Sequence, residues 1–361
     1  MRVKWSGIDI GKEELKAIKS CLKKKDISGF SPLIKKFENE ALKYTSNKYA
    51  VACSNGTVAL MTAFLAIKNY YNKKKLKIAV PSWSYIAPAN AADFMGELSL
   101  IDSDRDTHNI NYKDPKLEKS DIICAVDMAG VPSNYKNLKK FKKIIVSDAA
   151  ESFGSIYNST KKIGSDALIT TTSFQVSKII TTGEGGMIFT SNKKIYNICK
   201  LIINQGYGKG GYNLHDHVYK GFNFRITGIQ AALGIEQLKK IKKFFNKRKK
   251  IFNIYNSRLN KVLELHKIPI DSKSSYYSYV CLLKNNKLRN LLKKYLKEKK
   301  IETKLWKPIH LYKPYIRFKK NNFKNCNHIY NHHLRLPINN LTTEKEAHYV
   351  CDRIVEFFKN V

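Results

Sequence analysis

The sequence predicts an α/β protein, with a large domain built on a largely parallel sheet and a smaller α+β domain after it. Two observations carry this prediction. Between residues 49 and 190, short apolar runs alternate with helical patterns, and strands that alternate with helices form parallel sheets. Beyond residue 228, a long helical pattern leads into one strand-like run and two further helical patterns. At 361 residues, 43% of them hydrophobic, the chain can bury both domains.

The predicted strands of the large domain are short and apolar, as buried strands are. They lie at 49–53, 78–80, 98–101, 122–126, 144–146, 168–174 and 187–189. In such sheets, functional sites form beyond the carboxyl ends of the strands, where the connecting loops gather. We therefore expect the candidate functional residues at these ends.

The long helical pattern covers residues 228–260 and turns strongly basic after Gln237. We interpret it as the bridge out of the large domain. It is followed by a predicted strand at 279–283, a helix at 286–299 and a final helix at 344–358. The large domain is therefore placed at 1–240 and the small domain at 241–361, and roughly the first 25 residues are expected to pack with the small domain.

The chain is strongly basic, with 66 Lys+Arg against 29 Asp+Glu and a net charge of +37. A basic nucleic-acid-binding protein is therefore an alternative from another functional class. However, lysine outnumbers arginine by 57 to 9 and the excess is spread along the chain. This distribution favours a solvated surface, so we expect no nucleic-acid partner. The positive field would also attract a phosphorylated small substrate.

Composition also bears on location and metals. The chain has no run of about 18 apolar residues, and Met1–Ser6 lacks the apolar core of a signal peptide; we therefore expect a cytoplasmic protein without a membrane span. The seven cysteines stand singly. The fragments His215–His217 and His332–His333 have no matching second pair, so no metal site is expected.

Lys178 differs from the other lysines in its surroundings. Most lysines stand in polar clusters such as Lys73–Lys75, whereas Lys178 follows a β-branched and aromatic run that ends at Phe174 and precedes Gly183–Gly186. A lysine condenses with an aldehyde near neutral pH only where burial or a neighbouring cation favours its uncharged amine. Lys178 is therefore a candidate Schiff-base residue.

Other candidates also follow predicted strands. Asn55–Thr57 joins a strand to a helix, and its free N–H groups predict an anion site, with an ordinary helix cap as the alternative. Asp148 ends a strand and could pair with a cationic ring nitrogen, or again serve as a cap. Trp83 could stack on a flat ring, although a lone tryptophan is more often core.

A further segment, Gly221–Arg225, alternates polar and aromatic residues directly before the long helix. In an extended loop, Asn223 and Arg225 would present two donors to an anion. The alternative is an edge segment whose polar side faces water.

Together these segments resemble the DegT/DnrJ/EryC1/StrS family of pyridoxal-phosphate (PLP) sugar aminotransferases over nearly the whole chain. The matching motifs are Asn55–Leu60, Val80–Tyr85, Asp148–Gly154, Ser173–Lys178 with Thr182–Gly186, and Gly221–Arg225 leading into Gln230–Gly234. The resemblance implies an aspartate-aminotransferase-like fold (PLP fold type I) with a mixed, mainly parallel sheet. It also implies a homodimer with shared active sites.

The resemblance implies a role for each matching residue. Lys178 would condense with the PLP aldehyde, Asp148 would pair with the pyridine nitrogen, and Trp83 would stack on the ring. Glu151 would lie beside the ring and its 3-hydroxyl. The phosphate would be held by Gly56, Thr57, Ser173 and, from the neighbouring subunit, Asn223.

The resemblance also implies the reaction, an amine transfer from L-glutamate to a nucleotide-linked keto-deoxy sugar in surface-polysaccharide or glycan biosynthesis. Asn204–Gly206 and Trp306–His310 resemble segments of members that aminate C4 of 4-keto-6-deoxy sugars; amination at C3 is the alternative. Tyr85, Arg225 and His310 are the candidates on the substrate side. Many members have His-Pro where this chain has Gln175-Val176, a difference expected to alter the substrate side. Members with histidine in place of the lysine can be dehydratases, so Lys178 favours amine transfer.

Overall fold

The computed structural model describes residues 1–208 and 216–360, and a mixed seven-stranded sheet forms its centre. The sheet has the strand order β1-β9-β8-β5-β4-β2-β3, with β1 (Tyr49–Cys53), β2 (Lys77–Pro81), β3 (Glu97–Ile101), β4 (Ile122–Val126), β5 (Ile144–Asp148), β8 (Ile169–Ser173) and β9 (Gly186–Thr190). Strand β9 is antiparallel to both of its neighbours, and the pairs from β8 to β3 are parallel. The predicted strands and the mixed, mainly parallel sheet are confirmed.

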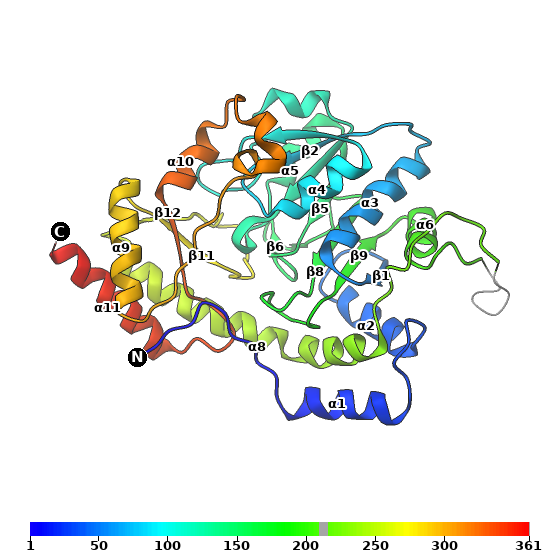
Figure 1. Ribbon diagram of the computed structural model, residues 1–361, viewed down its shortest axis with the longest axis horizontal. Helices are drawn as coiled ribbons and strands as arrows, with labels where there is room; N and C mark the ends of the chain where they lie inside the picture. The colour runs from blue at the N-terminus through cyan, green and yellow to red at the C-terminus, as the bar shows by residue number, and fades with distance from the viewer. Residues whose placement is uncertain (209–215, 361) are drawn as a thin grey trace.

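Helices cover both faces of this sheet (Figure 1). The helices up to the long bridge are α1 (Lys12–Lys23), α2 (Pro32–Leu42), α3 (Gly56–Tyr70), α4 (Ile86–Met95), α5 (Tyr135–Leu138), α6 (Lys193–Ile203) and α8 (Gly228–Leu259). After the bridge come α9 (Asn286–Glu298), α10 (Lys324–His332) and α11 (Glu344–Lys359). Short 3-10 helices lie at Pro115–Lys119, Met128–Gly130, Lys139–Phe141, Ile309–Leu311 and Lys313–Phe318. Of the predicted helices, 228–260, 286–299 and 344–358 are confirmed to within a residue at each end.

Side chains along the strands alternate between the two faces of the sheet. On β4, Ile122 and Cys124 join the cluster that packs against α3, α4 and α6. Ile123 and Ala125 point into the cluster on the opposite face. Helices α2 and α8 cover the β1-β9-β8 half of the sheet, where Phe189 belongs to a separate cluster with residues of both helices. Because both faces are covered, the strands are almost continuously apolar.

A second, smaller core lies at the other end of α8 (Figure 1). Its sheet is antiparallel and consists of β10 (Glu264–Leu265), β11 (Tyr279–Leu282) and β12 (His333–Leu336). Helices α9 and α11 pack on it together with the C-terminal half of α8. A further two-stranded sheet pairs β6 (Ile156–Tyr157) with β7 (Lys161–Lys162). The predicted α+β character of the C-terminal part is confirmed.

The structure adds detail to the predicted division at residue 240. Helix α8 continues without a break through that position. Val3 joins the small core and pairs with Ile301 in a parallel bridge. In contrast, Ile309 and Phe323 return to the large core. The domain bounds themselves stay a prediction. In the described part of the chain, no helix combines the length and apolar character needed to cross a bilayer.

Candidate active site

A cavity of about 620 Å³ opens at the carboxyl ends of β4, β5 and β8, where sheets of this kind place their sites. Seven of the predicted site residues line it: Gly56, Thr57, Tyr85, Asp148, Glu151, Ser173 and Lys178. The wall is completed by side chains from distant segments, among them Tyr277 and Trp306. The structure therefore gathers most of the predicted set around one space.

Lys178 lies in the loop between β8 and β9, and hydrogen bonds tie this loop at its base. The Phe174 N–H donates to the Gly185 carbonyl at 2.8 Å, and the Thr182 N–H donates to the Phe174 carbonyl at 2.9 Å. The Phe174 ring is fully buried against Phe37, with ring centroids 5.1 Å apart. The lysine is thus presented from a loop that is anchored in the core.

The charge of Lys178 depends on the groups around it. Its Nζ lies 4.8 Å from the centre of the Tyr277 ring. Burial lowers the pKa of Lys178, but Tyr277, Glu151 and Asp148 together raise it above its ordinary value. The amine is therefore a cation in this ligand-free site, and the expectation that its surroundings alone keep it uncharged is not met. A cation paired with Asp148 would neutralise one of the negative charges that raise the pKa of Lys178, and would thereby lower that pKa.

Asp148 ends β5 at the floor of the cavity and is 5% exposed. Burial raises the pKa of Asp148 to about 6, against the opposing effects of a hydrogen bond from the Ala150 N–H, 3.0 Å away, and of Lys178. A buried carboxylate is stabilised by a cationic partner. Nearby, Glu151 Oε2 accepts a hydrogen bond from the Ala129 N–H at 2.7 Å.

The predicted anion site lies where α3 begins, at the cavity. Asn55 caps the helix, since its Oδ1 accepts from the Val58 N–H at 2.9 Å. The first helical bond runs from the Ala59 N–H to the Asn55 carbonyl, so the N–H groups of Gly56 and Thr57 precede the helical ladder and line the cavity. A Cβ on Gly56 would lie 2.8 Å from the Ser173 Cβ. Only glycine therefore lets the helix start and the end of β8 approach this closely.

Trp83 is not among the residues that line the cavity, so this placement gives no support to its predicted ring stacking, which stays a prediction. It is 1% exposed and packs edge-on against His333, with ring centroids 4.7 Å apart. Of the two aromatic residues in this motif, Tyr85 is the one that lines the cavity; it is 66% exposed, and its ring centroid lies 6.5 Å from that of Trp306.

His310 is likewise buried and does not line the cavity, and its predicted place near the sugar stays a prediction. Its Nδ1 lies 2.7 Å from Ser82 Oγ and its Nε2 lies 3.0 Å from Asn327 Oδ1. The ring also stacks on Phe323. With both nitrogens and one face engaged, His310 ties the Trp306–His310 segment to the residue after β2.

Asn223 and Arg225 lie outside this chain's own cavity. Asn223 is exposed and forms a bridge with Asn204. Arg225 donates to Asn204 Oδ1 at 2.9 Å and stacks over the Phe30 ring. The predicted reach of Asn223 into a neighbouring subunit therefore stays a prediction. Of the histidine fragments considered for metals, His215 lies outside the described residues, and His333 Nδ1 donates to the Ile329 carbonyl of α10 at 2.9 Å.

Sequence reasoning missed Tyr277, which contacts Lys178 and lies 3.3 Å from Ser177 Oγ through its hydroxyl. It lies two residues before the start of β11, in the run Ser274–Tyr279. That run of serine and tyrosine before a predicted strand was the available signal. Missed as well was Arg335, a buried arginine whose charge acts on Lys178.

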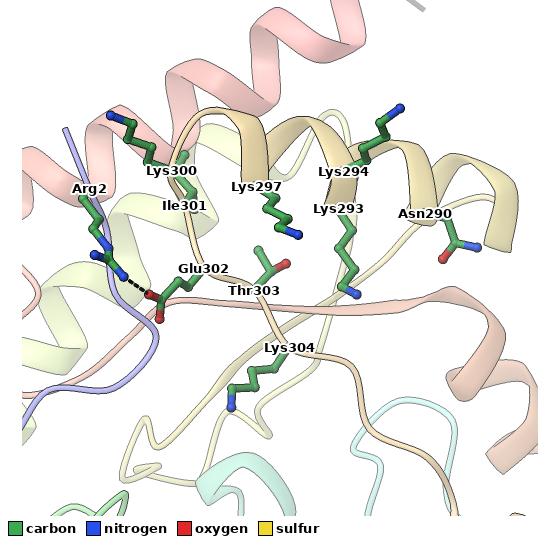
Figure 2. A pocket seen from close by; sticks show the side chains of 10 residues that line it. All are labelled: Arg2, Asn290, Lys293, Lys294, Lys297, Lys300, Ile301, Glu302, Thr303 and Lys304. Carbon is green, nitrogen blue, oxygen red and sulfur yellow. Dashed lines mark hydrogen bonds and ion pairs between the residues drawn. The ribbon is translucent and has the colours of Figure 1, made fainter.

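A larger cavity of about 970 Å³ lies elsewhere, beside α9, and shares none of these residues (Figure 2). Its lining is dominated by lysines, and Glu302 pairs there with Arg2 at 3.3 Å. In Figure 2, the side chains of Lys293 and Lys297 point down from α9 on the side of Thr303, whereas Lys294 points up and away. We interpret this cavity as part of the solvated basic surface.

The residues of the first cavity fit PLP. The Lys178 amine suits the aldehyde, the buried Asp148 carboxylate suits a protonated ring nitrogen, and the start of α3 suits the phosphate. On this mixed sheet, such a site defines the class: a PLP-dependent aminotransferase of the aspartate-aminotransferase-like fold.

Comparison with known proteins narrows the class. Residues 8–355 match the DegT/DnrJ/EryC1/StrS aminotransferase family, and the chain belongs to this family. It is 31% identical to the GDP-perosamine synthase of Escherichia coli O157:H7, over 97% of this chain and 96% of that protein. It is 29% identical to the UDP-4-amino-4,6-dideoxy-N-acetyl-β-L-altrosamine transaminase of Campylobacter jejuni, over 99% and 98%.

The fold is also that of a dehydratase. The E. coli GDP-4-keto-6-deoxy-D-mannose-3-dehydratase, solved with bound hydrated PLP, superimposes with a TM-score of 0.88 at 24% identity, over 98% of this chain and 100% of that one. Fold alone therefore does not distinguish amine transfer from dehydration. The protein is a sugar aminotransferase by its family and its relatives.

Proposed function

We propose that this enzyme transfers the amino group of L-glutamate to C4 of a nucleotide-linked 4-keto-6-deoxyhexose. The observation that carries the proposal is the grouping of Lys178, Asp148 and the start of α3 in one cavity. Support for C4 comes from the Campylobacter jejuni relative, whose product name specifies a 4-amino-4,6-dideoxy sugar. The synthase of GDP-perosamine is a second such relative. Amination at C3 is the competing possibility within the family.

When bound, PLP supplies the electron sink that a carbanion at the donor's α-carbon requires. Asp148 would hold the proton on the ring nitrogen, since its carboxylate is buried at the end of β5. As general base, Lys178 Nζ would take the proton from the donor's α-carbon. As general acid, it would then deliver this proton to the cofactor. Tyr277 and Glu151 lie close enough to control the charge of that amine.

A lysine at position 178 favours amine transfer over dehydration, because a lysine can both bind the aldehyde and carry this proton. The sugar site would be completed by a second subunit. In support of this, Asn223 and Arg225 lie outside their own cavity, and the neighbouring Phe222 is 46% exposed. Nucleic-acid binding is the weaker candidate, since no described feature beyond the basic surface supports it.

The test compares the wild-type protein with Lys178→Ala. We expect the purified wild type to be yellow and to form 2-oxoglutarate from L-glutamate when given a nucleotide-linked 4-keto sugar. Lys178→Ala should lose both the visible band and the turnover. Lys43→Ala, which removes a surface lysine that pairs with Glu40, is the control and should keep both. An unchanged band in Lys178→Ala would refute the site, and turnover with only 3-keto sugars would refute the C4 assignment.

A further inference from the structure

Arg335 on β12 is a buried cation without a partner. It is 0% exposed, and its Nε and both terminal nitrogens lack a hydrogen-bond partner among the described residues. Nor does any described carboxylate lie within ion-pair distance of it. A buried charge that is neither paired nor hydrogen-bonded costs several kcal/mol. Such a group indicates a missing partner.

The other fully buried arginine shows what a structural role requires. Arg248 is 2% exposed and donates to Asn340 Oδ1 at 2.8 Å and to the Tyr277 carbonyl at 3.0 Å. It also donates to the carbonyls of Tyr276 and Ile338. The fold thus gives one buried guanidinium four protein acceptors, through its Nε and one terminal nitrogen, and, within the described part of the chain, leaves the other without any.

The surroundings of Arg335 supply no negative charge in contact with it. Burial lowers the pKa of His108 and of His266, and it lowers the pKa of His333 to about 3, with the charge of Arg335 adding to each shift. All three rings are therefore neutral at pH 7. The Trp306 indole lies flat against the guanidinium, with its ring centre 3.3 Å from Cζ. This stacking is favourable, but it uses none of the five N–H donors.

Arg335 lies directly behind the wall of the PLP cavity. Trp306, which covers it, lines that cavity, as do Lys178, Glu151 and Tyr277. The charge of Arg335 acts on Lys178, while Glu151 and Tyr277 act on Arg335 in return. A small shift of the indole would therefore connect the guanidinium to the space beside the reacting amine.

We propose that Arg335 binds a carboxylate of the amino donor, and that the Trp306 indole covers the guanidinium when no donor is present. The planar guanidinium fork matches a carboxylate through two parallel hydrogen bonds. A carboxylate also fits the position better than a sugar diphosphate does. The diphosphate carries a nucleoside and needs an open path, whereas Arg335 is fully enclosed behind Trp306. The proposal rests on the proposed amine transfer, which requires an amino-acid donor.

The experiment uses the PLP-loaded enzyme and the variants Arg335→Met, Arg335→Lys and, as the matched control, Arg248→Met. Thermal unfolding is followed without ligand, with glutarate, with its neutral diamide, and with GDP or UDP. L-Glutamate is also titrated against the visible band, without any sugar. Because Arg335 lacks protein partners, Arg335→Met should unfold at the same or a higher temperature than the wild type when ligand-free. Arg248→Met leaves several carbonyl and amide acceptors without a donor. It should therefore unfold at a lower temperature than the wild type.

Glutarate should raise the unfolding temperature of the wild type but not of Arg335→Met, and the diamide should raise neither. The glutamate concentration at half-conversion should rise on the order of 100-fold in Arg335→Met, and by less in Arg335→Lys. The shift caused by GDP or UDP should be the same in both proteins. A variant that melts lower yet keeps its glutarate shift would make Arg335 structural and overturn the proposal. Loss of the nucleotide shift instead would assign Arg335 to the sugar diphosphate.

These readouts need no sugar substrate. If the enzyme fails to aminate 4-keto sugars but binds glutarate through Arg335, the proposed acceptor is wrong and the donor site stands. If sugars are aminated and Arg335→Met keeps the wild-type response to glutamate, the donor site is wrong and the acceptor stands.

Discussion

At the scale of single residues, the site works through charges held in a buried setting. Asp148 and Lys178 both line the cavity, and each alters the proton affinity of the other. The residues that could be predicted from the sequence are those in short local motifs at strand ends, such as Gly56 and Ser173. They line the cavity because the strand and the loop after it are adjacent in the chain.

The residues that could not be predicted depend on the tertiary fold. Trp83 and Tyr85 occupy neighbouring positions of one motif, and only the direction of the backbone after β2 decides that Tyr85 faces the cavity. From the sequence alone, His310 is an imidazole without known partners. The fold places Ser82 and Asn327 at its two ring nitrogens. Arg335 belongs to no local sequence motif. Only the folded structure shows that its guanidinium is buried without a hydrogen-bond partner among the described residues.

Asp148 should make the stability of the cofactor-free protein depend on pH. Its folded pKa of about 6 lies above the ordinary 3.8, so the folded state holds the proton more tightly than the unfolded chain does. The stability this gives is fully present below about pH 4 and is lost as the pH rises to about 6, on the order of 3 kcal/mol for this carboxyl. Asp148→Asn should flatten that decline in denaturant unfolding series. Asp127, whose pKa burial also raises to about 6, should maintain part of the decline in that variant. An unchanged slope would contradict the assignment.

Gly56→Ala should disturb the anion site without unfolding the protein. The added methyl would meet the Ser173 Cβ at 2.8 Å, and overpacking of this kind costs about 1–3 kcal/mol. We expect a lower unfolding temperature and weaker PLP binding, measured by equilibrium dialysis against free PLP. Wild-type PLP affinity in this variant would show that the helix start does not hold the phosphate.

At the scale of elements, patterns of apolar residues predicted the strands well because both faces of the sheet are covered. Helices α1 and α2 were harder to predict, since half of their residues face water and many are lysines. The short strand β12 was missed because it contains His333 and Arg335, two polar residues that only the buried setting explains.

The start of α8 is linked to the lysine loop, and Gln230→Ala should affect both. Gln230 Oε1 accepts from the Thr227 N–H at 3.0 Å in a capping box, while its Nε2 donates to the Glu184 carbonyl at 2.6 Å. Loss of the cap should cost about 1 kcal/mol, and loss of the second bond should loosen the loop and weaken PLP binding. The matched control is Glu346→Ala in the capping box of α11. It should cost a similar amount of stability and leave PLP affinity unchanged; equal losses of affinity in both would contradict the link.

At the scale of the whole molecule, the proposed second subunit can be tested by complementation. Lys178→Ala and Asn223→Ala proteins should each be inactive or nearly so. In a mixed dimer, the subunit that keeps Lys178 would receive Asn223 from its neighbour, so one of the two sites is intact. We therefore expect unfolding and refolding of the mixture to recover on the order of a quarter of the wild-type turnover, from half of the dimers with one site each. No recovery would mean that Asn223 acts within its own subunit or not at the phosphate.

The overall basic charge has little influence on the fold. Ion pairs across the molecule are mostly exposed, such as Lys267 with Asp106, and exposed pairs contribute little. The arrangement of two cores is fixed instead by apolar packing, and the sequence indicated it through the change of pattern after residue 228. The return of residues near Ile309 to the large core was beyond any local pattern.

Helix α8 has a consequence for how the molecule comes apart. Ile235 and Ile241 are buried against the main sheet, and Tyr255 and Leu259 are buried in the small core, on one uninterrupted helix. If either core unfolds, α8 loses part of its packing, and the other core loses part of the helix on which it packs. The enzyme should therefore lose its structure in a single cooperative heat-absorption peak, and a cofactor bound to the large core should delay the melting of the small one as well.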